Sequence, residues 1–168
     1  MPRLLILRHA KSNWDADYGT DHDRPLAGRG RKAARAIGKF MALADLVPDL
    51  AITSSAVRAG STLKLAMQAG DWKCPVESTP RLYGASTPDV LALLAERSDE
   101  ESILIVGHEP TWGSLVHTLT GASVRMATAT LVAIDFEFRS WSSIRPMAGR
   151  LALLIPPRIL TDGDLELG

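Results

Sequence analysis

Residues 4–9 read Leu-Leu-Ile-Leu-Arg-His, an uninterrupted apolar run that ends in two polar side chains. A short apolar run of this kind predicts a strand that is buried on both faces, as in the parallel sheets of α/β proteins. Arg8 and His9 then lie where the strand opens into a loop. A guanidinium is a charged planar fork that suits a phosphate, and an imidazole can be nucleophile, proton carrier or metal ligand. The pair alone is weak evidence, because many strands end in solvated polar side chains.

Further short apolar runs alternate with segments of helical periodicity along the chain. After residues 4–7, the predicted strands are residues 50–53, 76–78, 103–106, 130–138 and 150–155. The predicted helices are residues 30–44, a segment that starts at Ser54 or Ser55 and stops at Gly70, residues 87–97 and residues 111–121. This alternation predicts a three-layer α/β/α sandwich, in which a mostly parallel sheet of about six strands carries helices on both faces.

The length and composition favour one domain over residues 1–168. A chain of 168 residues with 46% hydrophobic residues is large enough for one core and small for two. Residues 11–24 are polar, lack periodicity and predict a long surface loop. Residues 156–168 begin with two prolines, and we expect them to form an extended tail.

The charge balance and the cysteine count exclude several classes of function. Lysine plus arginine equals aspartate plus glutamate at 19 each, so no overall field favours nucleic acid or an anionic membrane. A single cysteine, Cys74, permits no internal disulfide and fits a reducing compartment. The apolar runs are too short to span a bilayer. We therefore expect a cytoplasmic protein without a nucleic-acid or membrane partner.

Three predicted strand ends carry notable polar residues: Arg8 with His9, the segment 54–58, and Gly107 with His108. Ligands of open α/β sheets bind outside the carboxyl ends of the strands, so the three segments are expected to meet at one crevice. Two arginines and two histidines there would form a cationic pocket. A transferring phosphoryl group needs such a pocket, because its charge is spread over three equatorial oxygens.

Four stretches in this order carry a recognisable pattern: Leu-Arg-His-Ala-Lys-Ser at 7–12, Arg-Pro-Leu at 24–26 with Gly30, Ser-Ser-Ala-Val-Arg-Ala at 54–59 with Thr62, and Val-Gly-His-Glu-Pro at 106–110. The pattern resembles the histidine phosphatase superfamily, whose fold is that of phosphoglycerate mutases. The short chain and the Arg-His-Ala form are similar to its SixA-type phosphohistidine phosphatase branch. The resemblance implies that His9 attacks phosphorus and becomes phosphorylated. It also implies that Arg8, Arg58 and His108 bind and neutralise the phosphoryl oxygens.

This chemistry requires no metal or other cofactor, because a neutral imidazole is a competent nucleophile near neutral pH. A histidine pair could instead ligate zinc. His9 and His108 fall short of the three or four ligands that zinc takes, and neither His22 nor His117 stands at ligand spacing from them. We therefore predict a site without metal.

Three further residues are candidates for substrate binding. Lys11 and Ser12 follow the Arg-His pair and either donate hydrogen bonds to phosphate or shape the turn. Arg24 either points into the pocket or braces the loop through a salt bridge to Asp21 or Asp23.

The chain departs from the fuller family pattern in three ways. Ala10 stands where many members have glycine, which requires a backbone without a strongly positive φ. Asp15 stands where many relatives of the mutase branch have asparagine, so mutase-like substrate handling is not expected. Larger members carry a glutamate general acid in an inserted segment, where this chain has only residues 82–86. The remaining candidates for a proton donor are Asp15, Asp17, Asp21, Asp23 and Glu109, or none of them.

The absence of that segment predicts a shallow, open site. Such a site admits a phosphorylated side chain on a protein, and an imidazole leaving group asks less of a general acid than an alkoxide does. We therefore predict a metal-independent phosphatase for protein phosphohistidine, with a partner such as a histidine phosphotransfer domain. One alternative is a small-molecule phosphomonoesterase acting on a sugar or nucleotide phosphate. Another is a non-catalytic phosphate-sensing module, although binding alone would not need an imidazole poised for attack.

Overall fold

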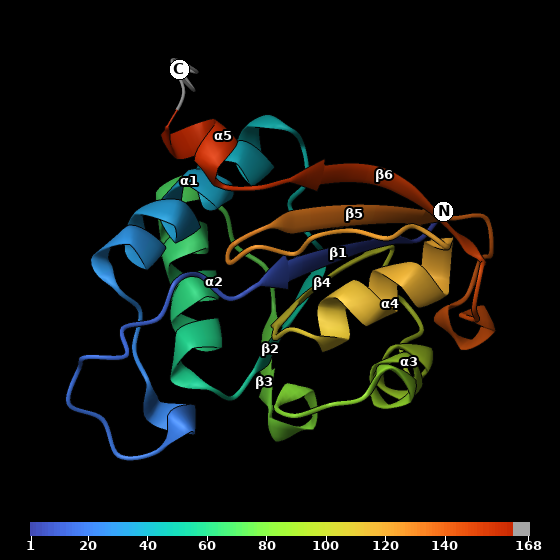
Figure 1. Cartoon of the computed structure of the whole chain (residues 1–168). Coiled ribbons are helices and arrows are strands. Elements are labelled where there is room, and N and C mark those ends of the chain that lie inside the picture. Colours follow the sequence, from blue (N-terminus) through green and yellow to red (C-terminus); the bar gives the residue numbers. More distant parts are fainter. Residues whose placement is uncertain (163–168) are drawn as a thin grey trace.

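A six-stranded mixed sheet forms the centre of the protein in a computed structural model, which describes residues 1–162 (Figure 1). Its strands lie in the spatial order β3-β2-β4-β1-β5-β6. Their bounds are β1 (Arg3–Arg8), β2 (Leu50–Ser54), β3 (Val76–Thr79), β4 (Ser102–Gly107), β5 (Leu131–Phe136) and β6 (Gly149–Ile155). The first four are mutually parallel, whereas β5 is antiparallel to both β1 and β6. The predicted mostly parallel sheet is confirmed.

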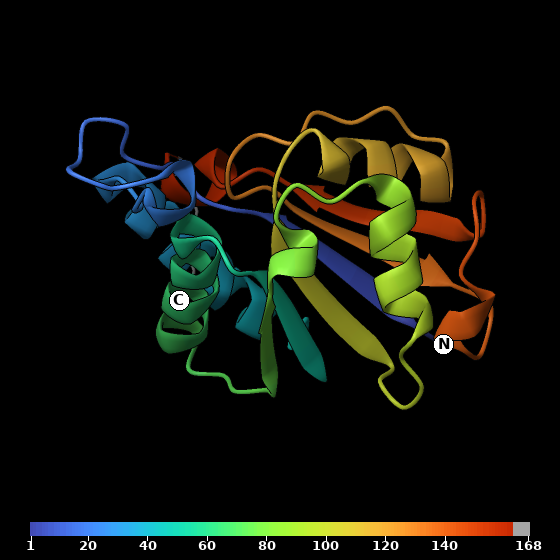
Figure 2. The same ribbon diagram turned by 90° about the horizontal axis from the view of Figure 1, so that it is seen from below.

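Helices cover both faces of this sheet, as Figures 1 and 2 show. The helices are α1 (Gly28–Leu43), α2 (Val57–Gly70), α3 (Thr87–Ala95), α4 (Thr111–Thr120) and α5 (Arg158–Thr161). Short 3-10 turns occur at η1 (Asp21–Asp23), η2 (Pro80–Leu82) and η3 (Trp141–Ser143). One apolar cluster joins the sheet to α1 and α2, and another joins it to α3 and α4. The predicted three-layer sandwich is confirmed. Within residues 1–162, no helix combines the length and the apolar character that a membrane crossing needs.

Strand β1 owes its central position to its apolar run. Leu4 and Ile6 pack in the cluster with α3 and α4, while Leu5 and Leu7 pack in the cluster with α1 and α2. All four side chains are fully buried. Successive side chains of a strand point to opposite faces, so only a continuous apolar run fills both layers. Burial of each such side chain contributes about 1.5–3 kcal/mol.

The ends of α2 differ from the sequence-based prediction. Ala56, rather than Ser54 or Ser55, precedes the first residue of α2, because the Ser54 hydroxyl accepts a hydrogen bond from the Ala56 amide before the helix begins. Gly70 is the last helical residue instead of the stop signal, and Asp71 adopts the left-handed conformation with φ of 52°. Asparagine and aspartate tolerate that conformation better than most residues do.

The expectation of an extended tail from residue 156 onward is wrong for residues 158–161. These residues form α5, which follows Pro157. Proline has a φ that is already suited to the start of a helix, so the two prolines initiate a turn instead of preventing one. Leu160 packs against the apolar cluster beneath α1. The rest of the predicted tail, residues 163–168, lies outside the described residues.

Candidate active site

The carboxyl ends of β2, β4 and β1, three neighbouring strands, meet at one edge of the sheet. The parallel register pairs Arg8 with Gly107, so His9 and His108 follow adjacent strands side by side. The His9 amide donates to the Gly107 carbonyl at 2.9 Å, and the two imidazole ring centres lie 5.2 Å apart. Arg58 enters from the first turn of α2, directly after β2. We call Arg8, His9, Arg58 and His108 the four-residue site.

His9 is almost fully buried and its ring is held by its own turn. Its Nδ1 lies 2.7 Å from the Ala10 carbonyl oxygen. A carbonyl only accepts hydrogen bonds, so Nδ1 carries the proton and Nε2 keeps a free lone pair. Burial, as the largest cause, lowers the pKa of His9 to about 3. The imidazole is therefore neutral near pH 7, which is the protonation state that a nucleophile needs.

Ala10 fits this turn for the reason predicted from the sequence. Among the described residues other than glycine, positive φ angles occur at Asp45, Asp71, Ala129 and Met147, and Ala10 is not one of them. The Ala10 amide donates to the Thr62 hydroxyl at 2.9 Å, and that hydroxyl donates to the Arg58 carbonyl at 2.7 Å. Thr62 thus ties the turn that holds His9 to the helix that carries Arg58.

His108 is positioned by a serine of the neighbouring strand. Its Nε2 lies 2.8 Å from the Ser54 hydroxyl. Burial first, and the nearby charge of Arg58 second, lower the pKa of His108 to about 4. The Tyr83 ring and the imidazole pack in a T-shaped arrangement, with the ring centres 5.6 Å apart. A cavity of 290 Å³ opens beside His108, between residues 82–85 and residues 108–112.

Arg8 and Arg58 each donate a hydrogen bond to a backbone carbonyl, and each has a further N–H group without a partner among residues 1–162. Arg8 donates from one terminal nitrogen to the Met126 carbonyl at 2.9 Å, and Arg58 donates in the same way to the Asp21 carbonyl at 2.7 Å. The Nε atoms of both Arg8 and Arg58 are buried and have no hydrogen-bond partner among residues 1–162. A buried donor without a partner costs free energy. A bound oxyanion could satisfy such donors, which gives the four-residue site the character of an anion site.

Asp21, one of the candidate proton donors, is held as an anion. Its carboxylate accepts hydrogen bonds from the Tyr83 hydroxyl at 2.7 Å, from Arg58 at 3.1 Å and from Arg24. The hydrogen bond from Tyr83, followed by those from the arginines, holds the pKa of Asp21 well below its usual range. An aspartate that is ionised throughout the neutral range has no proton to donate.

The other candidate donors are engaged elsewhere or exposed. The Asp23 carboxylate accepts from the Thr20 amide, and this hydrogen bond lowers the pKa of Asp23. The Glu109 carboxylate accepts from the Gly113 amide at 2.6 Å, in the first turn of α4. Asp15 and Asp17 are exposed in the loop before η1. The identity of a proton donor among these residues stays a hypothesis.

Arg24 and Ser12 brace the loop that follows β1. The Arg24 Nε donates to the Ser12 hydroxyl at 2.9 Å, and the guanidinium also pairs with the Asp21 carboxylate. The guanidinium carbon lies 3.6 Å from the centre of the Trp14 ring. A salt bridge from Arg24 to Asp21 or Asp23 was one of the two roles predicted for Arg24, and the structure contains the salt bridge to Asp21. Lys11 is exposed and lines a different cavity. Substrate binding by Lys11, Ser12 or Arg24 stays a prediction.

Sequence reasoning missed three neighbours of the four-residue site. The sequence places Ser54 at one of the three polar strand ends, but it does not predict that the Ser54 hydroxyl contacts His108. Tyr83 contacts Asp21, and His22 lies 2.9 Å from the Ser55 hydroxyl and packs edge-on against Tyr83. Neither Tyr83 nor His22 belongs to a periodic segment, so no sequence pattern points to either of them. Over residues 1–162, no group of three or more histidine, cysteine or acidic side chains is arranged to hold a metal ion.

Comparisons with known proteins identify the family of the chain. Residues 4–89 match the model of the histidine phosphatase superfamily, branch 1. An uncharacterised chloroplastic protein of Arabidopsis thaliana is 30% identical over 158 residues, which cover 88% of this chain and 72% of the relative. Two solved structures are similar at 26% identity and a TM-score of 0.80, and both are assigned as phosphohistidine phosphatase SixA. The structure from Nakamurella multipartita covers 93% of this chain and 96% of its own, and that from Agrobacterium tumefaciens covers 94% and 99%. The chain therefore belongs to the histidine phosphatase superfamily, and the prediction that it is a phosphatase is confirmed.

Proposed function

We propose that this phosphatase removes the phosphoryl group from histidine side chains of proteins, through a phosphohistidine intermediate on His9. The observation that carries the proposal is the state of His9. Its imidazole is buried and neutral, its Nδ1 proton is fixed on the Ala10 carbonyl, and its Nε2 is free. This is the state of a nucleophile ready to attack. The two arginines of the site each have a buried Nε that lacks a hydrogen-bond partner within residues 1–162.

In the first step, the His9 Nε2 attacks the phosphorus in line with the bond from phosphorus to the substrate imidazole. A new nitrogen–phosphorus bond forms as the old one breaks, and the bonding electrons stay with the substrate imidazole, which then takes a proton. Arg8, Arg58 and His108 bind the three equatorial oxygens, where negative charge gathers in the transition state. Because Nδ1 is already protonated, His9 carries a positive charge once it is phosphorylated and is a good leaving group in the next step.

In the second step, water attacks the phosphorus of phosphorylated His9. The nitrogen–phosphorus bond breaks, its electrons return to Nε2, and inorganic phosphate leaves after the water has given up a proton. No metal takes part in either step of the proposed mechanism. Imidazole needs less help from a general acid than an alkoxide does, which agrees with the ionised state of Asp21 and the capping contact of Glu109.

The surroundings of the site support a protein as substrate. Only the short turn η2 and residues 83–86 connect β3 to α3 beside His108. No large insertion therefore covers the four-residue site from this side. A side chain that projects from a folded protein can reach such a site without a lid having to open. The two solved structures at 26% identity, both assigned as phosphohistidine phosphatases, favour the same substrate class.

A small-molecule phosphomonoesterase is the second candidate, and the cavity beside His108 favours it. Its volume of 290 Å³ is close to the lower end of the range for small-ligand pockets, about 300 Å³. A sugar or nucleotide phosphate could place its organic part there. Alkoxide leaving groups would then need a proton donor.

A substrate panel tests the proposal. The protein is incubated with a chelator and either a histidine phosphotransfer domain phosphorylated on histidine or a set of sugar and nucleotide monophosphates. We expect kcat/KM for the phosphorylated domain to exceed that for every ester by at least about 100-fold, the discrimination that about 2.7 kcal/mol provides. Turnover of the esters alone would support the second candidate. Loss of activity in the chelator would reject the metal-free mechanism, and phosphate binding without turnover of any substrate would favour a sensing module.

A further inference from the structure

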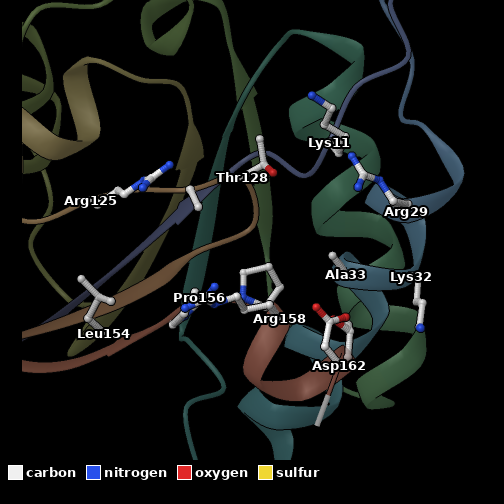
Figure 3. Close-up of a pocket in the computed structure, with 13 residues that line it drawn as sticks. Lys11, Arg29, Lys32, Ala33, Arg125, Thr128, Leu154, Pro156, Arg158 and Asp162 are labelled. Atoms are coloured by element: carbon white, nitrogen blue, oxygen red, sulfur yellow. The ribbon is translucent and has the colours of Figure 1, made fainter.

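A cationic groove, lined in part by the loop that follows His9, is not used by the proposed chemistry (Figure 3). Its volume is 680 Å³, and its walls come from the loop after β1, the start of α1, the loop before β5, the end of β6 and α5. Its charged lining residues are Lys11, Arg29, Lys32, Arg125, Arg158 and Asp162. Five cations thus face one carboxylate in a chain whose formal net charge is zero. The groove therefore carries a local positive field that composition alone does not reveal.

The cations of the groove are available to a ligand. All five are exposed, and within the described part of the chain none of them forms an ion pair with a carboxylate. By contrast, the two arginines of the four-residue site are buried or half-buried and are held by backbone carbonyls. Among residues 1–162, Asp162 is the one acidic side chain that lines the groove, so the described part of the chain leaves most of its positive charge uncompensated.

Two loops connect the groove to the four-residue site. Lys11 lies two residues after His9, so their Cα atoms are at most about 7.6 Å apart. On the other wall, Arg125 directly precedes Met126, whose carbonyl accepts the hydrogen bond from Arg8. The Ala129 amide, in the same loop, donates to the carbonyls of both Arg8 and His9 at 3.1 Å. The groove therefore shares two loops with the turn that holds Arg8 and His9.

The arrangement of the cations fits an extended partner better than a single small anion. Figure 3 shows Lys11 and Arg29 on the α1 side of the groove, with Arg125 across from them and Arg158 beside Pro156. The groove lining also includes apolar side chains, among them Ala33, Leu154 and Pro156. A phosphate site needs donors that converge on one point. Separated cations around an apolar floor match a protein surface on which carboxylates flank an apolar side chain.

We propose that the cationic groove docks an acidic stretch of the protein substrate while the four-residue site acts on its phosphohistidine. This inference rests on the proposed function, because it assumes that the substrate is a protein. The groove increases the affinity for the protein substrate and the rate at which the two proteins associate. It takes no part in the steps that form or break bonds. Docking in the groove would also let the enzyme distinguish one phosphorylated protein from another, because the distinguishing contacts lie outside the phosphohistidine.

The first test uses the double variant R29Q/K32Q and the single variant R158Q. Lys11 and Arg125 are left unchanged because they adjoin His9 and the carbonyl that holds Arg8. The matched control is R35Q/K39Q, which removes two exposed cations of the same helix α1 that do not line the groove. Each protein is assayed with a phosphohistidine-bearing phosphotransfer domain of acidic surface and with phosphoimidazole, which is too small to reach the groove.

For R29Q/K32Q we expect KM for the phosphorylated domain to rise about tenfold at low salt, with kcat unchanged, and to rise about threefold for R158Q. Both variants should hydrolyse phosphoimidazole at the parental rate, and the control should match the parent on both substrates. The difference between R29Q/K32Q and the parent should shrink at about 0.5 M salt, where exposed charges are screened. Equal KM values for the parent and both groove variants would overturn the proposal.

A binding experiment separates failure of the groove from failure of the proposed function. A fluorescent, unphosphorylated peptide of alternating glutamate and leucine is titrated into each protein, with no turnover required. Weaker binding by R29Q/K32Q but not by R35Q/K39Q would support the groove even if phosphohistidine were not the substrate. If the same variant instead weakened binding of tripolyphosphate or a single-stranded oligonucleotide and left the peptide unaffected, the acidic protein would be the wrong occupant.

Discussion

Arg58 and Asp21 form an ion pair that connects the first turn of α2 to the loop after β1. One terminal nitrogen of Arg58 lies 3.1 Å from the Asp21 carboxylate, and the other donates to the Asp21 backbone carbonyl at 2.7 Å. The Arg58 side chain is 6% exposed and that of Asp21 is 51% exposed. Asp21 therefore holds a buried cation in place from the solvent side. It also occupies donors that a phosphoryl group would use, so the anion and Asp21 compete for the same guanidinium.

Replacing Asp21 by asparagine should tighten the binding of inorganic phosphate by about threefold to tenfold, because a half-exposed carboxylate next to the anion site repels the anion only modestly. The inhibition constant of phosphate, measured in the hydrolysis assay, reports this change. Asp23→Asn is the matched control, because Asp23 lies in the same loop but binds Thr20. An equal effect of both substitutions would mean that general loop charge, and not competition for Arg58, sets phosphate affinity.

Replacing His9 by alanine should abolish the proposed covalent intermediate and lower kcat by at least about 1000-fold, since the proposed nucleophile is lost. Rapid quenching with a radiolabelled substrate measures the phosphorylated enzyme directly. His117→Ala serves as the control, because His117 is exposed on α4. Hydrolysis by the His9 variant at the parental rate would show that another group attacks phosphorus.

Ser54 acts as a positioning residue for His108, and its replacement by alanine should lower kcat about fivefold to twentyfold while KM changes little. The hydroxyl lies 2.8 Å from the His108 Nε2, so its loss frees the imidazole to rotate. Ser54→Thr keeps a hydroxyl and should restore much of the rate. Ser55→Ala tests the neighbouring serine, whose hydroxyl contacts His22. A uniform loss of folded protein in place of a kcat effect would assign Ser54 a merely structural role.

The stability of the protein should fall as the pH drops from about 6.5 towards 4, and His9 should cause part of the fall. The pKa of His9 is about 3 in the folded chain, against about 6.5 for an unperturbed imidazole, so below pH 6.5 the unfolded chain binds a proton that the folded chain does not. Protons therefore favour unfolding in this range. His9→Asn removes this contribution, and between pH 7 and pH 4 it should lose about 2 kcal/mol less unfolding free energy than the parent.

Urea unfolding at several pH values, followed by circular dichroism, measures this difference. His117→Asn is the control for the loss of an exposed histidine. Parallel pH profiles for the parent and the His9 variant would mean that His9 is not held neutral by burial.

Gly30 lets α1 pack directly on the backbone of the loop after β1, and Gly30→Ala should destabilise the protein by about 1–3 kcal/mol. A Cβ atom at this position would lie 2.1 Å from the Lys11 carbonyl oxygen, so the helix or the loop would have to shift. Lys11 lies close to His9, and activity should fall as well. Gly60→Ala is the matched control, because a Cβ atom there meets nothing within 4 Å. That substitution should stabilise α2 by about 0.5–1 kcal/mol, as alanine is the better helix former. Urea unfolding of the two variants distinguishes these outcomes.

The strands could be predicted because most of them are short apolar runs in the sequence. The meeting of their ends could be predicted because ligands of open α/β sheets bind at the carboxyl ends of the strands. The run at residues 4–7 is apolar without interruption, as burial on both faces requires. Arg8, His9 and His108 come directly after such runs, and parallel strands bring their carboxyl ends together. The order β2-β4-β1 could not be predicted, since it depends on pairing between strands that are distant in the chain.

The contacts of the loop after β1 could not be predicted either. The loop holds four aspartates, Asp15, Asp17, Asp21 and Asp23, and the sequence suggests Asp21 and Asp23 alike as partners of Arg24 without pointing to Arg58. Only the fold brings Asp21 to Arg58 and to Tyr83, which are far away along the chain. Ser54 illustrates the same limit at a helix end. Its hydroxyl suits a helix cap by type, but the neighbouring strand supplies His108 as a tertiary partner.

The reversed direction of β5 brings a further connecting loop to the groove, and this loop contributes no side chain to the four-residue site. Leu131, the first residue of β5, pairs with Leu7 near the end of β1, so the connection 121–130 arrives at the same sheet edge as the loops that leave β1, β2 and β4. That connection supplies Arg125 and Thr128 to the groove but none of the four residues proposed to handle phosphate. If the groove docks the substrate, side-chain substitutions in this connection could alter partner choice across generations while the four residues are inherited unchanged. Insertions or deletions would instead move the Met126 carbonyl and the Ala129 amide, which hold the backbone and side chain of Arg8.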